Sequence, residues 1–173
     1  MGVTPERQQW AVDTMAIGPR DRVLEIGCGH GIAVSLICER LTTGQVTAID
    51  RSASMVRLAS QRNANHIAAG RAEFVAADLD AADLPSGGFD KVFAVNVSLF
   101  WLGTGPGQIE RVKSLLAHQG TLYVFHEPPK PSIAKTILDK AEATLKGHGF
   151  TTARHRATGR RGLPLTCVTG RVG

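Results

Sequence analysis

Three glycines at alternate positions constrain this chain more than any other feature. They are Gly27, Gly29 and Gly31. Before them, the short apolar run over 22–26 predicts a strand buried on both faces. After them, apolar residues recur at helical spacing over 32–41 until 42–44 end the pattern, with Gly44 as the expected C-terminal cap. A second strand is predicted over 45–50. The sequence therefore predicts a strand, a glycine turn, a helix and a strand.

The turn has the features of a nucleotide-binding backbone. Glycine permits positive φ and carries no Cβ, so a ligand can lie directly on the main chain. The helix that follows presents unpaired N–H groups to such a ligand. Asp50 ends the second strand and is placed to accept hydrogen bonds from ribose hydroxyls. Strand, turn, helix and terminal acid together favour a bound nucleotide over a tight turn without a ligand.

The spacing of the glycines distinguishes between cofactors. A dinucleotide fingerprint reads G-x-G-x-x-G, whereas this turn reads G-x-G-x-G and is preceded by Glu25 inside the strand. The pattern resembles motif I of the class I S-adenosylmethionine-dependent methyltransferases, and Asp50 resembles the acid that ends their second strand. The resemblance implies S-adenosylmethionine as the cofactor. It implies the following cofactor-binding residues: Glu25, Gly27, Cys28, Gly29, His30, Gly31, Asp50, Arg51, Asp78, Leu79 and Asn96.

The resemblance also suggests roles for these residues. Asp78 would contact the adenine amino group, and the N–H of Leu79 a ring nitrogen; the alternative for Asp78 is a cap or turn acid. Asn96, at the tip of the fourth strand, would face the methionine and methyl portion. Glu25 would orient the turn or meet the methionine amino group, and His30 would cover the carboxylate region.

The rest of the chain alternates helices with strands. Expected helices begin at Thr4–Pro5, run over 52–69 to Gly70, run over 109–116 to Gly120, and extend from a Ser132 cap to 147. Expected strands cover 72–78, 89–97, 121–125, 150–158 and 163–172, and 103–107 is expected to be a loop. The short linker 159–162 allows an antiparallel hairpin.

These elements predict an α/β fold. We expect a Rossmann-like, doubly wound, seven-stranded sheet that is mostly parallel, with an antiparallel last strand and helices on both faces. Residues 1–173 are expected to form a single domain, with a leading helix in 1–20, a cofactor-binding half in 21–100 and a substrate-side half in 101–173. Trp10 of the leading helix is expected to pack in the core or in a lid over the cofactor, and the alternative is a specific contact with the substrate.

Composition places the chain in a broad class. Its 173 residues are 43% hydrophobic and 20% charged, as in an ordinary globular domain, and no run approaches membrane-spanning length. No secretory signal is visible, so the expected compartment is the cytoplasm. The formal net charge of +5 permits an acidic partner without requiring one. Cys28, Cys38 and Cys167 show no paired spacing, so neither a metal site nor a disulfide framework is expected, and Cys38 and Cys167 are expected to be buried thiols.

Two residues after the fifth strand are the candidates for catalysis. Methyl transfer needs a base only if the acceptor arrives protonated. His126 is favoured because imidazole titrates in the useful range, and the alternative is a partly exposed loop histidine. Glu127 could bind a cationic substrate, accept a proton or meet Lys130 on the surface.

Aromatic residues follow the fourth strand. Phe100 and Trp101 could wall the substrate pocket or contact the sulfonium by cation–π attraction, or they could pack under the loop. Asn96 is followed by Val97 and Ser98, not by the two prolines typical of methyltransferases that act on nucleobase amino groups. Nucleobase methylation of that type is therefore disfavoured.

The favoured function is transfer of a methyl group from S-adenosylmethionine to a small-molecule O, N or C nucleophile. One rival is an RNA methyltransferase that uses the basic segment 154–161, but few aromatics are present for base stacking, and we do not expect a nucleic-acid or membrane partner. The other rival binds S-adenosylmethionine without transferring the methyl. The short loops leave an open cleft, which a second subunit of a homodimer could cover.

Overall fold

The computed structural model describes residues 5–103 and 106–173. The helices are α1 (Glu6–Met15), α2 (Ile32–Cys38), α3 (Ala53–Arg62), α4 (Ala64–Ala68), the 3-10 turn η1 (Ser98–Phe100), α5 (Pro106–Leu115) and α6 (Pro131–Gly147). The strands are β1 (Arg22–Ile26), β2 (Gln45–Asp50), β3 (Ala72–Ala76), β4 (Phe89–Val95), β5 (Leu116–His126), β6 (Thr151–Thr158) and β7 (Pro164–Arg171). Within these ranges, each helix is too short or too polar to cross a bilayer.

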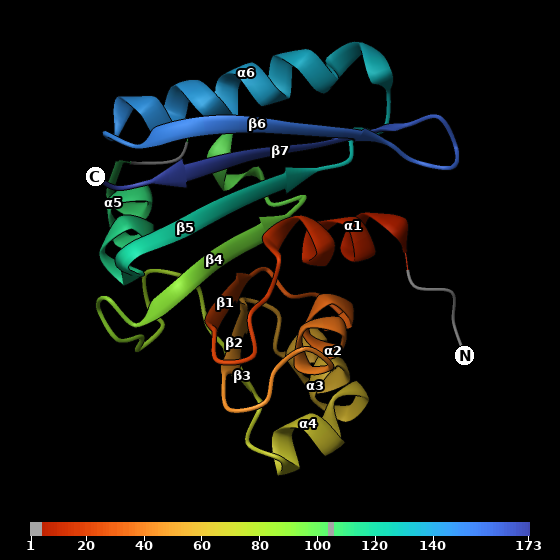
Figure 1. Cartoon of the computed structure of the whole chain (residues 1–173), viewed down its shortest axis with the longest axis vertical. Helices are drawn as coiled ribbons and strands as arrows, with labels where there is room; N and C mark the ends of the chain where they lie inside the picture. Colours follow the sequence, from red (N-terminus) through yellow and green to blue (C-terminus); the bar gives the residue numbers. More distant parts are fainter. Residues whose placement is uncertain (1–4, 104–105) are drawn as a thin grey trace.

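One seven-stranded sheet forms the centre of the molecule, in the order β3-β2-β1-β4-β5-β7-β6 (Figure 1). Strands β1 to β5 run parallel, and β7 is antiparallel to both of its neighbours. The order reverses between β1 and β4, which is where ligands bind in doubly wound sheets. The predicted fold class and the antiparallel hairpin are therefore confirmed.

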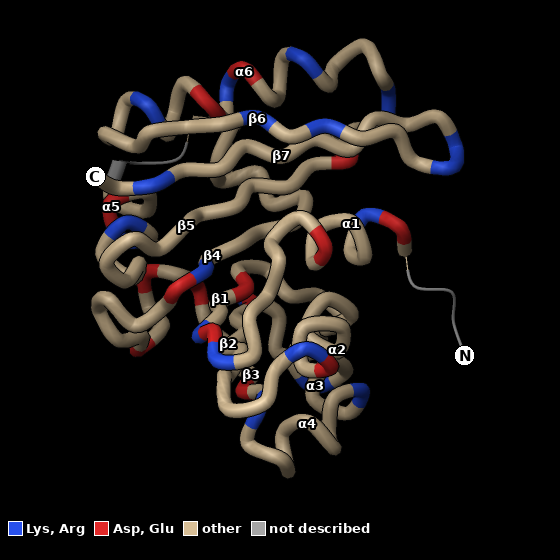
Figure 2. The backbone as a smooth tube through the Cα atoms, in the orientation of Figure 1, with Lys and Arg blue, Asp and Glu red and all other residues tan. Residues whose placement is uncertain are grey.

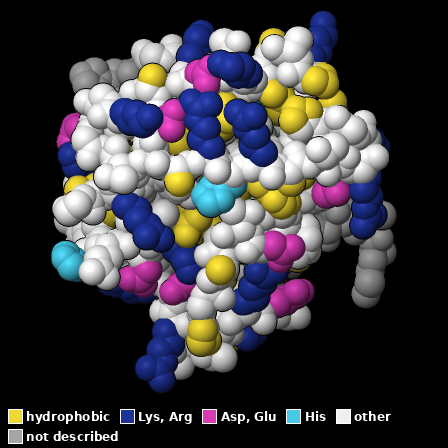
Figure 3. Space-filling model, turned by 45° about the horizontal axis from the view of Figure 1, so that its top comes forward, with side chains coloured by type: hydrophobic (Ala, Val, Ile, Leu, Met, Phe, Trp, Pro, Cys, Tyr) yellow, Lys and Arg dark blue, Asp and Glu magenta, His cyan; other side chains and the backbone are white. Residues whose placement is uncertain are grey.

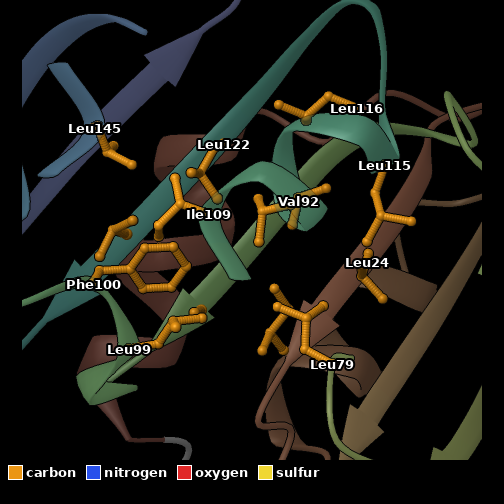
Figure 4. Packing of buried hydrophobic residues seen from close by; sticks show 14 of the residues in the cluster. Leu24, Leu79, Val92, Leu99, Phe100, Ile109, Leu115, Leu116, Leu122 and Leu145 are labelled. Carbon is orange, nitrogen blue, oxygen red and sulfur yellow. The ribbon is translucent and has the colours of Figure 1, made fainter. Parts of the chain in front are cut away.

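Alternating side chains of the strands build a separate core on each face of the sheet. On β1, Val23 joins the core under α1, α2 and α3, whereas Leu24 joins the core under η1, α5 and α6 (Figure 4). On β5, Tyr123 and Phe125 belong to the first core, and Leu122 and Val124 to the second. Because successive side chains of a strand point to opposite faces of the sheet, each residue at a strand tip faces one core or the other.

The first helix packs as expected. Trp10 of α1 meets Phe125 edge to face, with ring centroids 5.4 Å apart. The expected cap residue Thr4 lies outside the described residues, and Pro5 takes the N-cap position without a side-chain hydrogen bond. Cys28, Cys38 and Cys167 are all buried free thiols, so the expectation for Cys38 and Cys167 is confirmed.

Two helix ends near the cofactor half differ from the predictions. The helix α2 ends at Cys38, and Gly44 is not its cap. A Cβ on Gly44 would lie 2.4 Å from the carbonyl oxygen of Asp21, so this glycine allows two backbone segments to touch. The helix predicted over 52–69 is broken into α3 and α4 at Asn63, whose side chain is fully buried. Ser52 caps α3 by accepting a hydrogen bond from the N–H of Met55.

Four further boundaries differ. The helix predicted to extend to Gly120 ends at Leu115, because Leu116 already pairs with Phe89 in the sheet. The expected loop 103–107 includes residues 104–105, which lie outside the described residues, and α5 begins at Pro106. The helix α6 begins at Pro131, so Ser132 lies inside it and is not its cap. Strand β3 ends at Ala76, two residues before Asp78.

Candidate functional site

The glycine turn adopts a backbone that favours glycine at each of its three positions. Gly27, Gly29 and Gly31 have φ values of 76°, 50° and 68°. The N–H of Gly27 donates to the carbonyl of Ile49 at 2.8 Å, which ties the turn to β2. The N–H of Gly29 donates to the Asp50 carboxylate at 2.9 Å. The sequence therefore placed the turn beside the end of β2 correctly, and Asp50 itself holds the turn in shape.

A buried polar group that the sequence analysis missed supports the third glycine. The amide of Asn63 donates to the carbonyls of Gly31 at 3.0 Å and Ala59 at 2.9 Å, and its oxygen accepts from the Ser35 hydroxyl at 2.8 Å. A Cβ on Gly31 would lie 2.8 Å from the Asn63 amide nitrogen. The polar Asn63 within an amphipathic pattern was the available signal, but solvent exposure would produce the same pattern.

A cavity of about 200 Å³ opens above the turn. It brings together the predicted residues Glu25, Gly27, Cys28, Gly29, His30 and Asn96. Arg7 and Gln8 of α1 also line it, and neither was predicted as a site residue. They lie within one helical turn of the packed Trp10, and nothing in the sequence pattern of the helix marks them as ligand-binding residues. The leading helix therefore forms one wall of the cavity.

Two hydrogen-bond acceptors in this cavity lack partners. Oε2 of Glu25 and Oε1 of Gln8 are both buried, and neither has a hydrogen-bond partner within the described chain. Burial, with a smaller contribution from the Asp50 charge, raises the pKa of Glu25 well above its ordinary value. Burying acceptors without partners is costly, so native proteins usually supply a partner from protein, water or ligand. The cavity is thus suited to a ligand that donates hydrogen bonds, such as an ammonium group.

The residues expected on the adenosine side lie outside the lining of this cavity. The second oxygen of Asp50 accepts from the N–H of Ser52 at 2.9 Å. Arg51 and Asp78 are exposed, and Leu79 is buried in the core. The carbonyl of Asp78 accepts from the N–H groups of Ala81 and Ala82, so this residue also begins a turn. Its carboxylate makes no hydrogen bond or ion pair to the described residues and is available to a ligand.

Asn96 joins the tips of β4 and β5. Its backbone adopts a φ of 57°, and its N–H donates to the carbonyl of Phe125 at 2.9 Å. Its side-chain oxygen accepts from the N–H of Glu127 at 2.9 Å. Asn is among the few non-glycine residues that adopt this backbone readily. Asn96 thus lines the cavity while fixing the backbone after the fifth strand.

His126 points to the opposite face of the sheet from the glycine turn cavity, because it alternates with Phe125. Its ring lies 4.6 Å from that of Trp101, centroid to centroid, and both ring nitrogens are buried without a hydrogen-bond partner in the described chain. Burial lowers the pKa of His126 below its ordinary value. The alternative of a loop histidine is not what the structure shows, since His126 ends β5 and its nitrogens are shielded. It is a neutral imidazole able to accept a proton.

The structure decides between alternatives that the sequence left open: Phe100 takes the packing alternative, and Glu127 pairs with a residue that was not among its expected partners. Phe100 has no exposed surface and packs in the α5 and α6 core, so it does not wall a substrate pocket. Trp101 is half-buried beside His126 and remains available to a ligand. Glu127 pairs with Arg7 at 3.0 Å, not with Lys130. This ion pair holds α1, which forms one wall of the cavity, against the tip of β5.

The comparisons with known proteins agree with this geometry. Residues 23–120 match the family model described as a methyltransferase domain. Trans-aconitate 2-methyltransferase from Paracidovorax citrulli is 37% identical over 103 residues, which cover 59% of this chain and 37% of that enzyme. The chain spans about two fifths of the length of the trans-aconitate 2-methyltransferases that it matches.

Solved structures share the fold at low sequence identity. A SAM-dependent methyltransferase from Aquifex aeolicus superposes with a TM-score of 0.78 at 16% identity, covering 96% of this chain and 89% of that one. The [4+2]-cyclase SpnF superposes with a TM-score of 0.73, also at 16% identity, covering 96% of this chain and 81% of that one. From the family match over 23–120, together with the glycine turn and the sheet order, the chain belongs to the methyltransferase domain family, as its resemblance to class I S-adenosylmethionine-dependent methyltransferases predicted.

Proposed function

We propose that the protein transfers a methyl group from S-adenosylmethionine to a small-molecule O, N or C nucleophile. The observation that supports this most directly is the cavity over the glycine turn, where Glu25 and Gln8 present buried acceptors without partners. An ammonium group such as that of the methionine portion would supply the missing donors. Asp50 and the exposed carboxylate of Asp78 lie beyond the turn, where the ribose and adenine would be held.

The chain's own residues contribute positioning more than chemistry. S-adenosylmethionine supplies an electrophilic methyl and a leaving group that needs no proton. The glycine turn and Asn96 would hold the methyl donor at the β4 tip, and catalysis would then depend on positioning an acceptor beside it. His126 ends the neighbouring strand and faces the α5 and α6 side of the sheet, so it would act as a base for an acceptor that approaches the β4 tip from that side; its lowered pKa leaves it neutral and able to accept a proton at neutral pH. Trp101 shields that imidazole from water.

The basic hairpin supports a small-molecule acceptor over RNA. Arg154 is held by Asp139 at 2.8 Å and by Glu142, and its hydrogen bond to Glu142 is the main cause that lowers the pKa of that carboxyl to about 2. A guanidinium engaged by two carboxylates is not available to a phosphate. Figure 2 shows how acidic positions of α6 lie beside the basic positions of β6. The pairing of Arg154 therefore argues against a continuous phosphate-binding surface over 154–161.

Binding of the cofactor is the first test. We expect calorimetric titration under matched salt to show binding of S-adenosylmethionine and S-adenosylhomocysteine but not of NAD. Binding of NAD alone would contradict our interpretation of the glycine spacing. Because the same fold carries a [4+2]-cyclase, S-adenosylhomocysteine production with acceptor pools then separates a transferase from a binding protein without transfer.

Replacing Asp50 tests the cofactor's ribose contact. In Asp50→Ala, we expect S-adenosylhomocysteine to bind more weakly by about 1 to 3 kcal/mol, since charge-assisted hydrogen bonds to the ribose are lost and the N–H of Gly29 loses its acceptor. Calorimetry measures the affinity, and circular dichroism checks that the variant folds. Asp83→Ala, at an exposed loop acid away from the turn, serves as the control and should bind normally. Unchanged affinity in a folded Asp50→Ala protein would contradict the assignment.

A further inference from the structure

A second cavity, larger than the one over the glycine turn, lies between α6 and the β6–β7 hairpin. Its volume is about 440 Å³, and we call it the α6–hairpin pocket. Its walls are largely apolar. Three of the apolar lining residues come from α6 and two from the hairpin: Pro131, Ala134, Leu138, Ala157 and Pro164. Lys135 and Arg156 also line it. An apolar cavity with few polar groups at its edge is the usual form of a small-molecule site.

The charges around this pocket are unbalanced. Asp139 pairs with Lys135 and Arg154, and Glu142 pairs with Arg154 and Lys146. Those two carboxylates therefore serve three cations. Arg156, on the same face of β6 as Arg154, has no hydrogen bond or ion pair to any residue that the structure describes. Its guanidinium can bind a carboxylate through two parallel hydrogen bonds.

The surface over α6 and β6 carries both positive charge and exposed apolar side chains (Figure 3). Figure 3, which turns the top of Figure 1 forward, shows Lys and Arg side chains gathered over α6 and β6. Hydrophobic side chains are exposed beside them on the same face. An apolar hollow next to an unpaired cation is complementary to a molecule with an apolar chain and an acidic end.

The register of the strands places the pocket on a line with the proposed reaction site. Thr166 of β7 lines the pocket, pairs with Arg156 of β6 on one side and with His126 of β5 on the other, and donates its hydroxyl to the His126 carbonyl at 3.0 Å. The next strand is β4, which ends beside Asn96. Three strand spacings of about 4.8 Å each separate Arg156 from the β4 tip, or about 14 Å in all.

We propose that the α6–hairpin pocket holds the acidic end of the methyl acceptor, and that this acceptor is an extended amphipathic carboxylic acid. Its carboxylate pairs with Arg156, its chain lies on Ala134 and Leu138, and its far end passes His126 toward the β4 tip. This placement rests on the proposed methyl transfer. It sets a minimum length for the acceptor, because a short acid bound at Arg156 cannot reach across three strand spacings.

Decanoate is the probe for the pocket. Below its micelle concentration, we expect decanoate to bind the protein in calorimetric titrations, and butyrate and the cationic decyltrimethylammonium to bind at least tenfold more weakly. In Arg156→Gln, decanoate affinity should fall by roughly tenfold, the scale of one charge-assisted contact, while Arg156→Lys restores part of it. The control is Arg161→Gln, at an exposed arginine of the hairpin tip that does not line the pocket, and it should bind decanoate as the wild type does.

Measuring S-adenosylhomocysteine in the same samples separates this proposal from the proposed function. We expect decanoate and S-adenosylhomocysteine to bind together, since their sites lie on different strands. If S-adenosylhomocysteine binds and decanoate does not, or if Arg156→Gln and Arg161→Gln bind decanoate equally, the pocket proposal is wrong and the cofactor site stands. If decanoate binds through Arg156 but S-adenosylhomocysteine does not bind, the methyltransferase function fails instead. Mutual exclusion of the two ligands would overturn the placement of the acceptor.

Discussion

Gly31→Ala is expected to destabilise the protein by about 2 to 5 kcal/mol and to abolish cofactor binding. A side chain at a φ of 68° costs about 1 to 2 kcal/mol, and crowding in a packed interior adds about 1 to 3 kcal/mol. The new Cβ would lie 2.8 Å from the Asn63 amide nitrogen and 2.9 Å from the Ala59 Cβ. Neither neighbour can move freely, because Asn63 and Ala59 are both fully buried and Asn63 is also hydrogen-bonded. Urea unfolding of the purified variant measures the loss.

Gly29→Ala provides the matched comparison. This glycine also has a positive φ, of 50°, but a Cβ there would meet no atom within 4 Å. We therefore expect only the conformational cost, about 1 to 2 kcal/mol, and a folded protein. The added methyl group would stand at the proposed cofactor site, so S-adenosylhomocysteine binding should still be lost. If both variants lost the same stability, packing against Asn63 would not be the reason that position 31 needs glycine.

Glu25→Gln is expected to change stability and ligand affinity in opposite directions. Without ligand, the buried carboxylate of Glu25 is costly when ionised, so the neutral amide should stabilise the unliganded protein by about 1 to 3 kcal/mol at pH 8. With ligand, the variant lacks the negative charge that would meet an ammonium group. We expect S-adenosylhomocysteine affinity to fall by about 1.5 to 3 kcal/mol, as for other hydrogen bonds to charged groups.

The pH dependence distinguishes this explanation from a general effect of the substitution. Because burial raises the pKa of Glu25 in the folded state, the unfolded chain releases this proton at lower pH than the folded protein does. The stability of the unliganded wild type should therefore fall as pH rises above the ordinary value of 4.5 and level off above the raised pKa. Glu25→Gln should lack this decline, whereas Glu39→Gln, at an exposed position, should keep it. Equal pH profiles in wild type and Glu25→Gln would refute the assignment.

The sequence predicted those parts of the fold that depend on local patterns. The strand, glycine turn and helix around residues 22–38 and the antiparallel hairpin each follow from periodicity and turn residues, and each was found in the structure. The boundaries that differed depend on contacts between distant segments. Gly44 touches the backbone of Asp21, and Asn63 bonds to Gly31, 32 residues away in sequence. Neither contact leaves a periodic signal.

The predictable site residues are those that the backbone conformation or the end of a strand demands; residues that reach the site only through tertiary packing were not predictable. The glycines can be recognised because few other residues adopt a positive φ readily. The acid at the end of the strand can be recognised because few side chains can accept hydrogen bonds from ribose hydroxyls. Arg7 and Gln8 could not be recognised, since any exposed helix carries such residues and only the packing of α1 on Phe125 brings them over the turn. The burial of Phe100 likewise depends on the α5 and α6 core, which is assembled from later segments.

The docking of α1 has a consequence for how the chain acquires its structure during synthesis. The contacts of α1 reach far along the sequence: Arg7 pairs with Glu127, and the Glu6 carboxylate accepts from the N–H of Arg160, 154 residues away. Because synthesis runs from the N-terminal side, α1 leaves the ribosome before the β6–β7 hairpin and cannot dock fully until that hairpin has emerged. Long-range contacts of this kind slow folding, because the intervening chain must be ordered before they form. We therefore expect the wall that α1 forms over the glycine turn to be completed only after the β6–β7 hairpin is in place.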